Sequence, residues 1–92
     1  MINKTKLYKA AKILNALDND IRSRIIKVLL VGGKSYREIW MCLASPISGH
    51  LDTLVELGLV IRETAPDNSV TFYANRDKLN KINKAVKKFS KI

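Results

Sequence analysis

Cysteine and histidine are almost absent from this chain of 92 residues, which has one of each, Cys42 and His50. A single cysteine cannot form an internal disulfide, and the pair cannot supply the three or four ligands of a transition-metal site. This cysteine usage fits a reducing compartment inside the cell. We therefore expect a cytoplasmic protein that holds no metal ion and no other cofactor.

Long hydrophobic runs are also missing. No stretch approaches the roughly 18 apolar residues that a membrane-spanning helix needs. Lys9 and Lys12 interrupt the segment that would have to form the apolar part of a signal peptide. We expect no membrane partner.

Acidic residues are few: the chain has eight Asp and Glu residues and 17 Lys and Arg residues, which gives a formal net charge of +9. Such a charge favours a polyanionic partner, either a nucleic acid or an anionic membrane surface. The scattered carboxylates and the lone histidine form no nucleophile–base arrangement, so we expect no enzymatic activity. The hydrophobic fraction of 47% is that of a globular chain and excludes wholesale disorder.

A helix-turn-helix pattern occupies residues 35–58. Ser35 and Glu38 match the capping box that begins a helix. Apolar residues then recur at helical spacing and predict one buried stripe: Tyr36, Ile39, Trp40 and Leu43.

The second helix of the pattern is predicted over residues 45–57, with Ser45 as its N-cap and Pro46 in its first turn. Gly58 can adopt the left-handed conformation that ends a helix. The predicted buried residues are Ile47, Leu51 and Leu54, and the opposite face is small and polar: Ser48, Gly49, Asp52, Thr53 and Glu56. A helix with such a face is typical of the element that enters a DNA groove.

Helices are predicted on both sides of this pattern. A basic amphipathic helix over residues 5–17 is best explained as a packing or dimer helix, with a membrane-surface anchor as the alternative. Asn19 caps the next helix, which ends at two glycines and is expected to bury Ile21, Ile25, Val28 and Leu29. Asn75 caps a last helix over residues 76–92, whose apolar seam fits a partner helix.

Between the second helix of the pattern and the last helix, residues 59–64 and 70–74 have the composition of two strands joined by a five-residue turn. This order predicts a mainly helical α+β fold, the winged helix-turn-helix. We expect one domain over residues 1–92, with the helix-turn-helix at 35–58 and a β-hairpin wing at 59–75.

Three segments resemble ArsR/SmtB-type transcriptional regulators. ALDNDIRSRIIKVLL is similar to that family's ALADPTRLRILRLL, SPISGHLDTLVELGLV to its STVSRHLKVLREAGLV, and TFYAN to its VYYRL. The likeness covers about residues 14–75. The pattern SxHLxxLxxxGLV is fairly specific to winged helices and moderately specific to this family.

The resemblance implies a homodimer that binds a pseudo-palindromic operator in double-stranded DNA and usually represses transcription. It implies that the two copies pair through residues 1–17 and 76–92. The apolar seams of these two helices support such pairing, because each seam fits a partner helix. The residues expected at the dimer interface are Leu7, Leu14, Leu79, Ile82, Val86 and Phe89.

By the same analogy, the start of the second helix lies nearest the bases, while basic residues on its flanks hold phosphates. The candidate DNA-binding residues are Ser45, Pro46, Ser48, Gly49, His50, Thr53, Lys34, Arg37, Arg62 and Arg76. For His50 the alternative is a polar residue on a helix flank that is simply solvated.

The sequence departs from the family at several points. Metal-sensing members carry a CxC pair in the first helix of the pattern, where this chain has EIWMC, so metal sensing is not expected. The family's arginine before the histidine is Gly49, and residues 45–75 carry a net charge of −3 against +6 for residues 76–92. No Arg or Lys, the residues that commonly read guanine, lies on the predicted recognition helix.

Two other functions stay open. The chain could be a protein-interaction module, which the acidic Asp52 and Glu56 favour, or a nonspecific architectural DNA binder that uses its terminal lysines. Cys42 is expected to be a small buried hydrophobe, with a redox sensor as the alternative. Trp40 and Met41 are expected in the core or at a dimer contact, with an apolar ligand pocket as the alternative.

Overall fold

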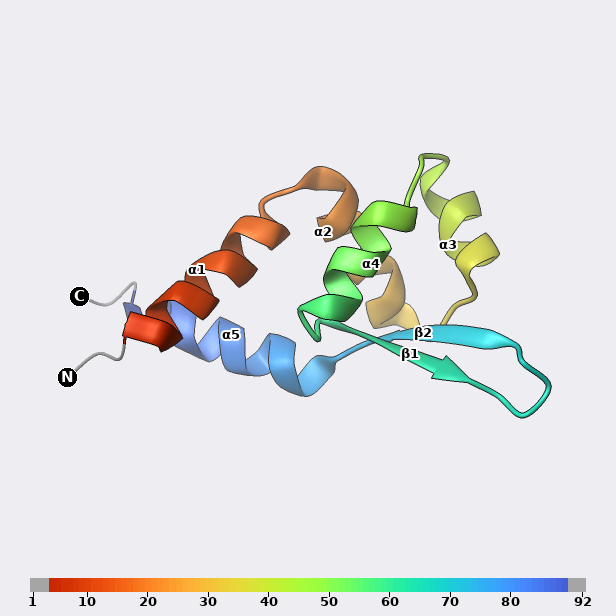
Figure 1. Ribbon diagram of the computed structural model, residues 1–92. Helices are drawn as coiled ribbons and strands as arrows, with labels where there is room; N and C mark the ends of the chain where they lie inside the picture. Colours follow the sequence, from red (N-terminus) through yellow and green to blue (C-terminus); the bar gives the residue numbers. More distant parts are fainter. Residues whose placement is uncertain (1–3, 90–92) are drawn as a thin grey trace.

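The computed structural model describes residues 4–89, with the side chains of residues 11–84. Within this range the chain folds into five helices and one hairpin (Figure 1): α1 (Lys4–Leu17), α2 (Asp20–Val31), α3 (Tyr36–Leu43), α4 (Ser48–Glu56), β1 (Val60–Thr64), β2 (Val70–Ala74) and α5 (Arg76–Phe89). The order is that of a winged helix-turn-helix, so the predicted mainly helical α+β fold is confirmed.

The molecule is elongated, with extents of 48 × 28 × 21 Å. Helices α2, α3 and α4 cluster on one side of the hairpin (Figure 1). Helices α1 and α5 reach towards one end of the molecule, and the tip of the hairpin forms the other end. The helix-turn-helix therefore lies between the terminal helices and the wing.

The core is built from α2, α3, α4 and the start of the hairpin. Six side chains are completely buried: Ile25, Ile39, Ile47, Leu54, Leu59 and Val60. Burial of each is worth about 1.5–3 kcal/mol relative to exposure. On α2 the predicted burial of Ile25 and Leu29 is confirmed, whereas Ile21 and Val28 are only half-buried and Ile26 is buried in addition.

Side chains cap three of the helices as the sequence predicts. Asn19 caps α2 and Asn75 caps α5, each accepting a hydrogen bond from the backbone N–H three residues further on, at 3.1 and 3.2 Å. At α3 the full capping box is present: the Ser35 hydroxyl accepts from the Glu38 N–H, and the Glu38 carboxylate accepts from the Ser35 N–H. These bonds satisfy N–H groups that otherwise have no partner at a helix start.

The predicted start of α4 is wrong. The helix begins at Ser48, and Ser45 and Pro46 lie in the turn before it. Helix α3 ends at Leu43, its C-cap Ala44 is left-handed with φ 52°, and the chain then carries Ile47 into the core, where it is fully buried. The predicted burial of Ile47 is confirmed, but the residue is the N-cap of α4 and not part of its first turn.

Helix α3 is less buried than its sequence predicts. Ile39 and Leu43 lie in the core, but the remaining large apolar residues are exposed: Tyr36, Trp40 and Met41. The helix has only eight residues and rests on the core along a narrow stripe. The prediction that Cys42 is buried is therefore wrong, since it is exposed. Trp40 and Met41 are exposed and lie outside the core, so of their two predicted places the dimer contact stays a prediction.

The wing is an antiparallel hairpin, as predicted, and in its register Val60 pairs with Ala74 and Thr64 with Val70. The segment before α3 joins it, because Lys34 and Phe72 exchange two backbone hydrogen bonds of 3.0 and 2.8 Å. The hairpin is therefore tied directly to the helix-turn-helix.

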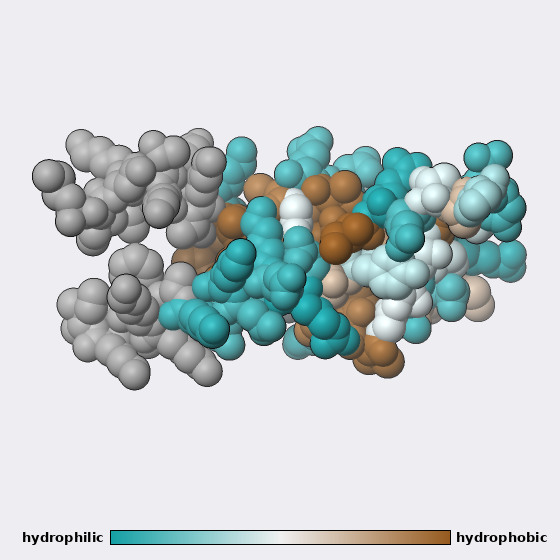
Figure 2. All heavy atoms as spheres, turned by 90° about the horizontal axis from the view of Figure 1, so that it is seen from below, coloured by the Kyte–Doolittle hydropathy of each residue, from teal (hydrophilic) through white to brown (hydrophobic). Residues whose placement is uncertain are grey.

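One face of the hairpin carries an exposed apolar pair, Ile61 opposite Tyr73. The Tyr73 ring covers Gly33, where any Cβ would clash with it. Figure 2, a view from below, shows hydrophobic side chains in several patches across the middle of the molecule, among hydrophilic ones.

Three of the six residues expected at the dimer interface have described side chains. Leu14 is exposed, whereas Leu79 and Ile82 are half-buried and pack against the core. The other three lie outside the residues whose side chains are described: Leu7, Val86 and Phe89.

Two glycines of the helix-turn-helix are expected to respond oppositely to alanine. Gly58 has φ +75°, and a Cβ there would lie 2.9 Å from the Lys78 ammonium nitrogen, so Gly58→Ala should destabilise the protein by about 1 kcal/mol. A Cβ at Gly49 meets no atom within 4 Å, so Gly49→Ala should stabilise it by about 0.5 kcal/mol. Urea unfolding followed by circular dichroism measures both changes. A loss of stability in Gly49→Ala would contradict the open space described at that position.

Candidate nucleic-acid interface

Helix α4 presents a small polar surface. Its buried residues are Leu51 and Leu54, while Ser48, Gly49 and Asp52 are exposed. The N-cap residue is Ile47, which makes no side-chain hydrogen bond to the helix. The backbone N–H groups at the start of α4 therefore lack a side-chain cap.

A groove runs along the side of α4 that faces the start of α2, and we call it the α2-side groove. It is lined by Arg22, Pro46, Ser48, Gly49, His50 and Thr53. Five of these six residues are candidates from the sequence, and the structure brings them together. The hydroxyl of Thr53 donates to the carbonyl of Gly49 at 3.0 Å, so its one hydrogen is used within the helix.

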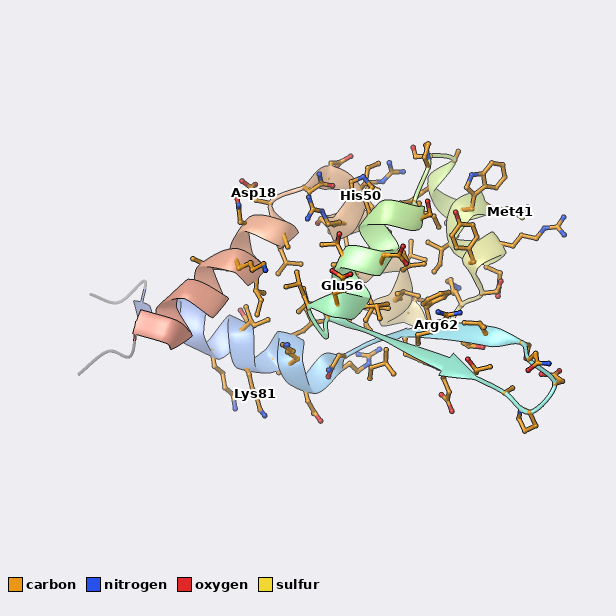
Figure 3. All side chains as sticks on the ribbon, in the orientation of Figure 1. Asp18, Met41, His50, Glu56, Arg62 and Lys81 are labelled. Carbon is orange, nitrogen blue, oxygen red and sulfur yellow. The ribbon has the colours of Figure 1, made fainter. Side chains whose placement is uncertain are left out.

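A second groove, the wing-side groove, separates α4 from the hairpin. Its polar residues are Tyr36, Ser48, Asp52, Glu56 and Arg62. His50 near one end of α4, Glu56 at the other, and Arg62 on β1 mark the two grooves in Figure 3. This groove therefore places two carboxylates beside one guanidinium, whereas no carboxylate lines the α2-side groove.

The other basic candidates are spread around the fold. Lys34 is half-buried where the chain pairs with β2, and Arg37 is exposed in the first turn of α3. Arg76 begins α5 and donates a hydrogen bond to the carbonyl of Leu30, near the end of α2. Part of the hydrogen-bonding capacity of Arg76 is thus used within the protein.

The C-terminal end of α4 is held by the start of α5. The Lys78 ammonium donates to the Leu57 carbonyl, and the Asn75 side-chain amide donates to the Gly58 carbonyl at 2.8 Å. The negative end of the α4 dipole also stabilises a cation at this position. From the sequence, the lysines of the last helix are expected to lie on its solvated face. For Lys78 this expectation is wrong, because the residue is half-buried and bonded.

Sequence reasoning also missed Arg22 as a residue of this surface. The one signal for Arg22 in the sequence is its place in the segment ALDNDIRSR, because the ArsR/SmtB-type family also carries an arginine there. The spacing of residues in the sequence cannot predict that the start of α2 lies beside the start of α4, because this contact depends on how the two helices pack.

Over the described part of the chain, no three His, Cys, Asp or Glu side chains gather in a way that could hold a metal ion. None of the helices described is both long and apolar enough to span a lipid bilayer.

The structure is similar to that of an ArsR-like transcriptional regulator from Rhodococcus sp. RHA1. The TM-score is 0.82 at 21% sequence identity, and the match covers 94% of this chain and 83% of that one. No protein-family model matches the sequence, and no curated protein matches it significantly. The chain has the winged helix-turn-helix fold of an ArsR-like regulator, as the sequence resemblance implied.

The capping box that begins α3 should make stability depend on pH. The Ser35 backbone N–H and then the Ser35 hydroxyl lower the pKa of the exposed Glu38 carboxyl. A carboxyl whose pKa is lowered by folding stabilises the protein above its unfolded pKa, and this contribution is lost as the pH falls through the folded pKa. Wild type should therefore melt above Glu38→Gln at neutral pH, and the difference should shrink in acid. A constant difference in melting temperature would contradict this role.

Proposed function

We propose that this protein is a transcriptional regulator that binds double-stranded DNA as a homodimer, with α4 in the major groove. The observation that carries the proposal is the exposed start of α4, which is small, polar and uncapped, on a fold shared with an ArsR-like transcriptional regulator. Small residues such as Ser48 and Gly49 let the helix backbone approach base edges closely, and the major groove is wide enough for a helix.

Binding strength in this proposal comes mainly from outside α4. The helix carries two carboxylates and no Lys or Arg, while the whole chain carries a net charge of +9. Contacts between basic side chains and phosphates release counterions, and this supplies most of the nonspecific affinity of DNA-binding proteins. Arg62 at the wing and Arg37 on α3 are exposed and available for such contacts.

We further propose that the chain acts as one domain and pairs through α1 and α5. These helices reach the same end of the molecule, and Leu14 is exposed on α1 (Figure 1). Two-fold pairing would let the two α4 helices enter successive major grooves, about 34 Å apart. An operator occupied in this way would be closed to transcription, which makes repression the expected outcome.

A protein-interaction module is the second candidate, because α3 exposes three large apolar residues: Tyr36, Trp40 and Met41. Solvent-exposed apolar groups that lie close together often mark a protein-binding surface.

A binding assay separates these functions. The duplex upstream of the protein's own gene is compared with an unrelated duplex at two salt concentrations. We expect tighter binding of the upstream duplex and a steep loss of affinity at high salt. Equal affinities would instead identify an architectural binder, and no binding of any duplex together with a co-purifying protein would identify an interaction module.

Charge changes on α4 should act in opposite directions. Ser48→Glu adds a carboxylate where the helix meets DNA and should weaken binding by about tenfold or more, since charge repulsion at contact distance costs on the order of 1 kcal/mol or more. Asp52→Asn removes a carboxylate from the same helix and should strengthen binding. Fluorescence anisotropy measures both affinities, and analytical ultracentrifugation checks that assembly is unchanged. Normal binding by Ser48→Glu would show that α4 does not enter the groove.

A further inference from the structure

Arg22 lies in the first turn of α2 and extends along the side of α4. It lines the α2-side groove, and it also lines a neighbouring groove with Thr53 and Glu56. Its Nε is buried and has no hydrogen-bond partner among the described residues. A buried donor without a partner costs about 1–3 kcal/mol. Because this nitrogen is closed off from solvent, an anion in the groove would meet the part of the half-buried Arg22 side chain that lines the groove.

We propose that Arg22 binds a phosphate of the DNA backbone in the α2-side groove. The inference rests on the proposed function and adds to it a specific residue and the path of one DNA strand. A guanidinium is always charged and presents paired N–H donors that match two phosphate oxygens, which makes arginine well suited to this role.

The neighbours of Arg22 in the groove fit the same ligand. His50 and Ser48 add donors, and Gly49 leaves the backbone open, because no atom lies within 4 Å of its missing Cβ. The start of α4 has no side-chain cap, so its N–H groups are also available to an anion entering beside Arg22.

The distribution of charge across α4 gives independent support. The α2-side groove contains Arg22 and no acidic side chain, although Glu56, in the last turn of α4, lines the neighbouring groove that Arg22 also reaches. The wing-side groove contains Asp52 and Glu56, which repel phosphate and leave Arg62 as its only cation. A DNA strand that follows α4 therefore meets less repulsion on the α2 side. In this arrangement the phosphate held by Arg22 fixes α4 against one DNA strand, and the wing-side flank of α4 faces the interior of the DNA major groove.

The test compares Arg22→Gln with Arg24→Gln. Both substitutions remove one positive charge from α2, but Arg24 lies about 200° around the helix, is exposed, and lines neither groove. Affinity for a duplex that the wild type binds is measured by anisotropy over a series of salt concentrations. Arg22→Gln should weaken binding about tenfold and reduce the slope of log affinity against log salt by about one for each subunit. Arg24→Gln should leave the slope unchanged.

An unchanged salt slope in Arg22→Gln would overturn the inference, and so would equal losses in the two variants. Failure of the wild type to bind any duplex would instead overturn the proposed function, so the two failures are distinct. Circular dichroism checks the fold of both variants. If Arg22→Gln does not fold, Arg22→Lys keeps the charge and should retain the wild-type slope with a weaker affinity, whereas wild-type affinity in that variant would count against a phosphate held by the paired guanidinium N–H donors.

Discussion

The burial of Ile47, immediately before α4, is the contact on which the recognition surface depends. Complete burial of such a side chain is worth about 1.5–3 kcal/mol. The chain takes Ile47 into the core at the N-cap position, and α4 begins at Ser48. As a result, the first turn of α4 has small side chains and open N–H groups, and these properties suit close approach to DNA.

The other end of α4 is fixed by contacts from distant parts of the chain. Asn75 and Lys78, at the start of α5, bond the carbonyls that end α4, and the backbone pairing of Lys34 with Phe72 ties α3 to the wing. Helix α4 is thus held to α5, and α3 is held to the hairpin. If α5 pairs two copies, as we propose, these same bonds transmit the geometry of the dimer to the two recognition helices.

Features that depend on near neighbours in the chain could be predicted from the sequence. The caps at Asn19, Ser35 and Asn75 each join groups three residues apart, and Gly58 adopts the left-handed conformation that its position indicated. Features that depend on packing could not. Cys42 is exposed because α3 contacts the core along only one narrow stripe, although its composition is apolar. The placement of Arg22 beside α4 and the bond from Lys78 to a carbonyl 21 residues away leave no periodic pattern in the sequence.

In the complex that we propose, α4 recognises the shape of the major groove, and cations around it supply most of the binding strength. Hydroxyl-radical footprinting of the duplex upstream of the protein's own gene tests this claim most directly, because it maps the protected sugars on each strand. We expect two protected tracts with centres about ten base pairs apart, as two recognition helices in successive major grooves require. Uniform protection along the duplex, or a single tract at any protein concentration, would contradict paired entry of α4 into DNA.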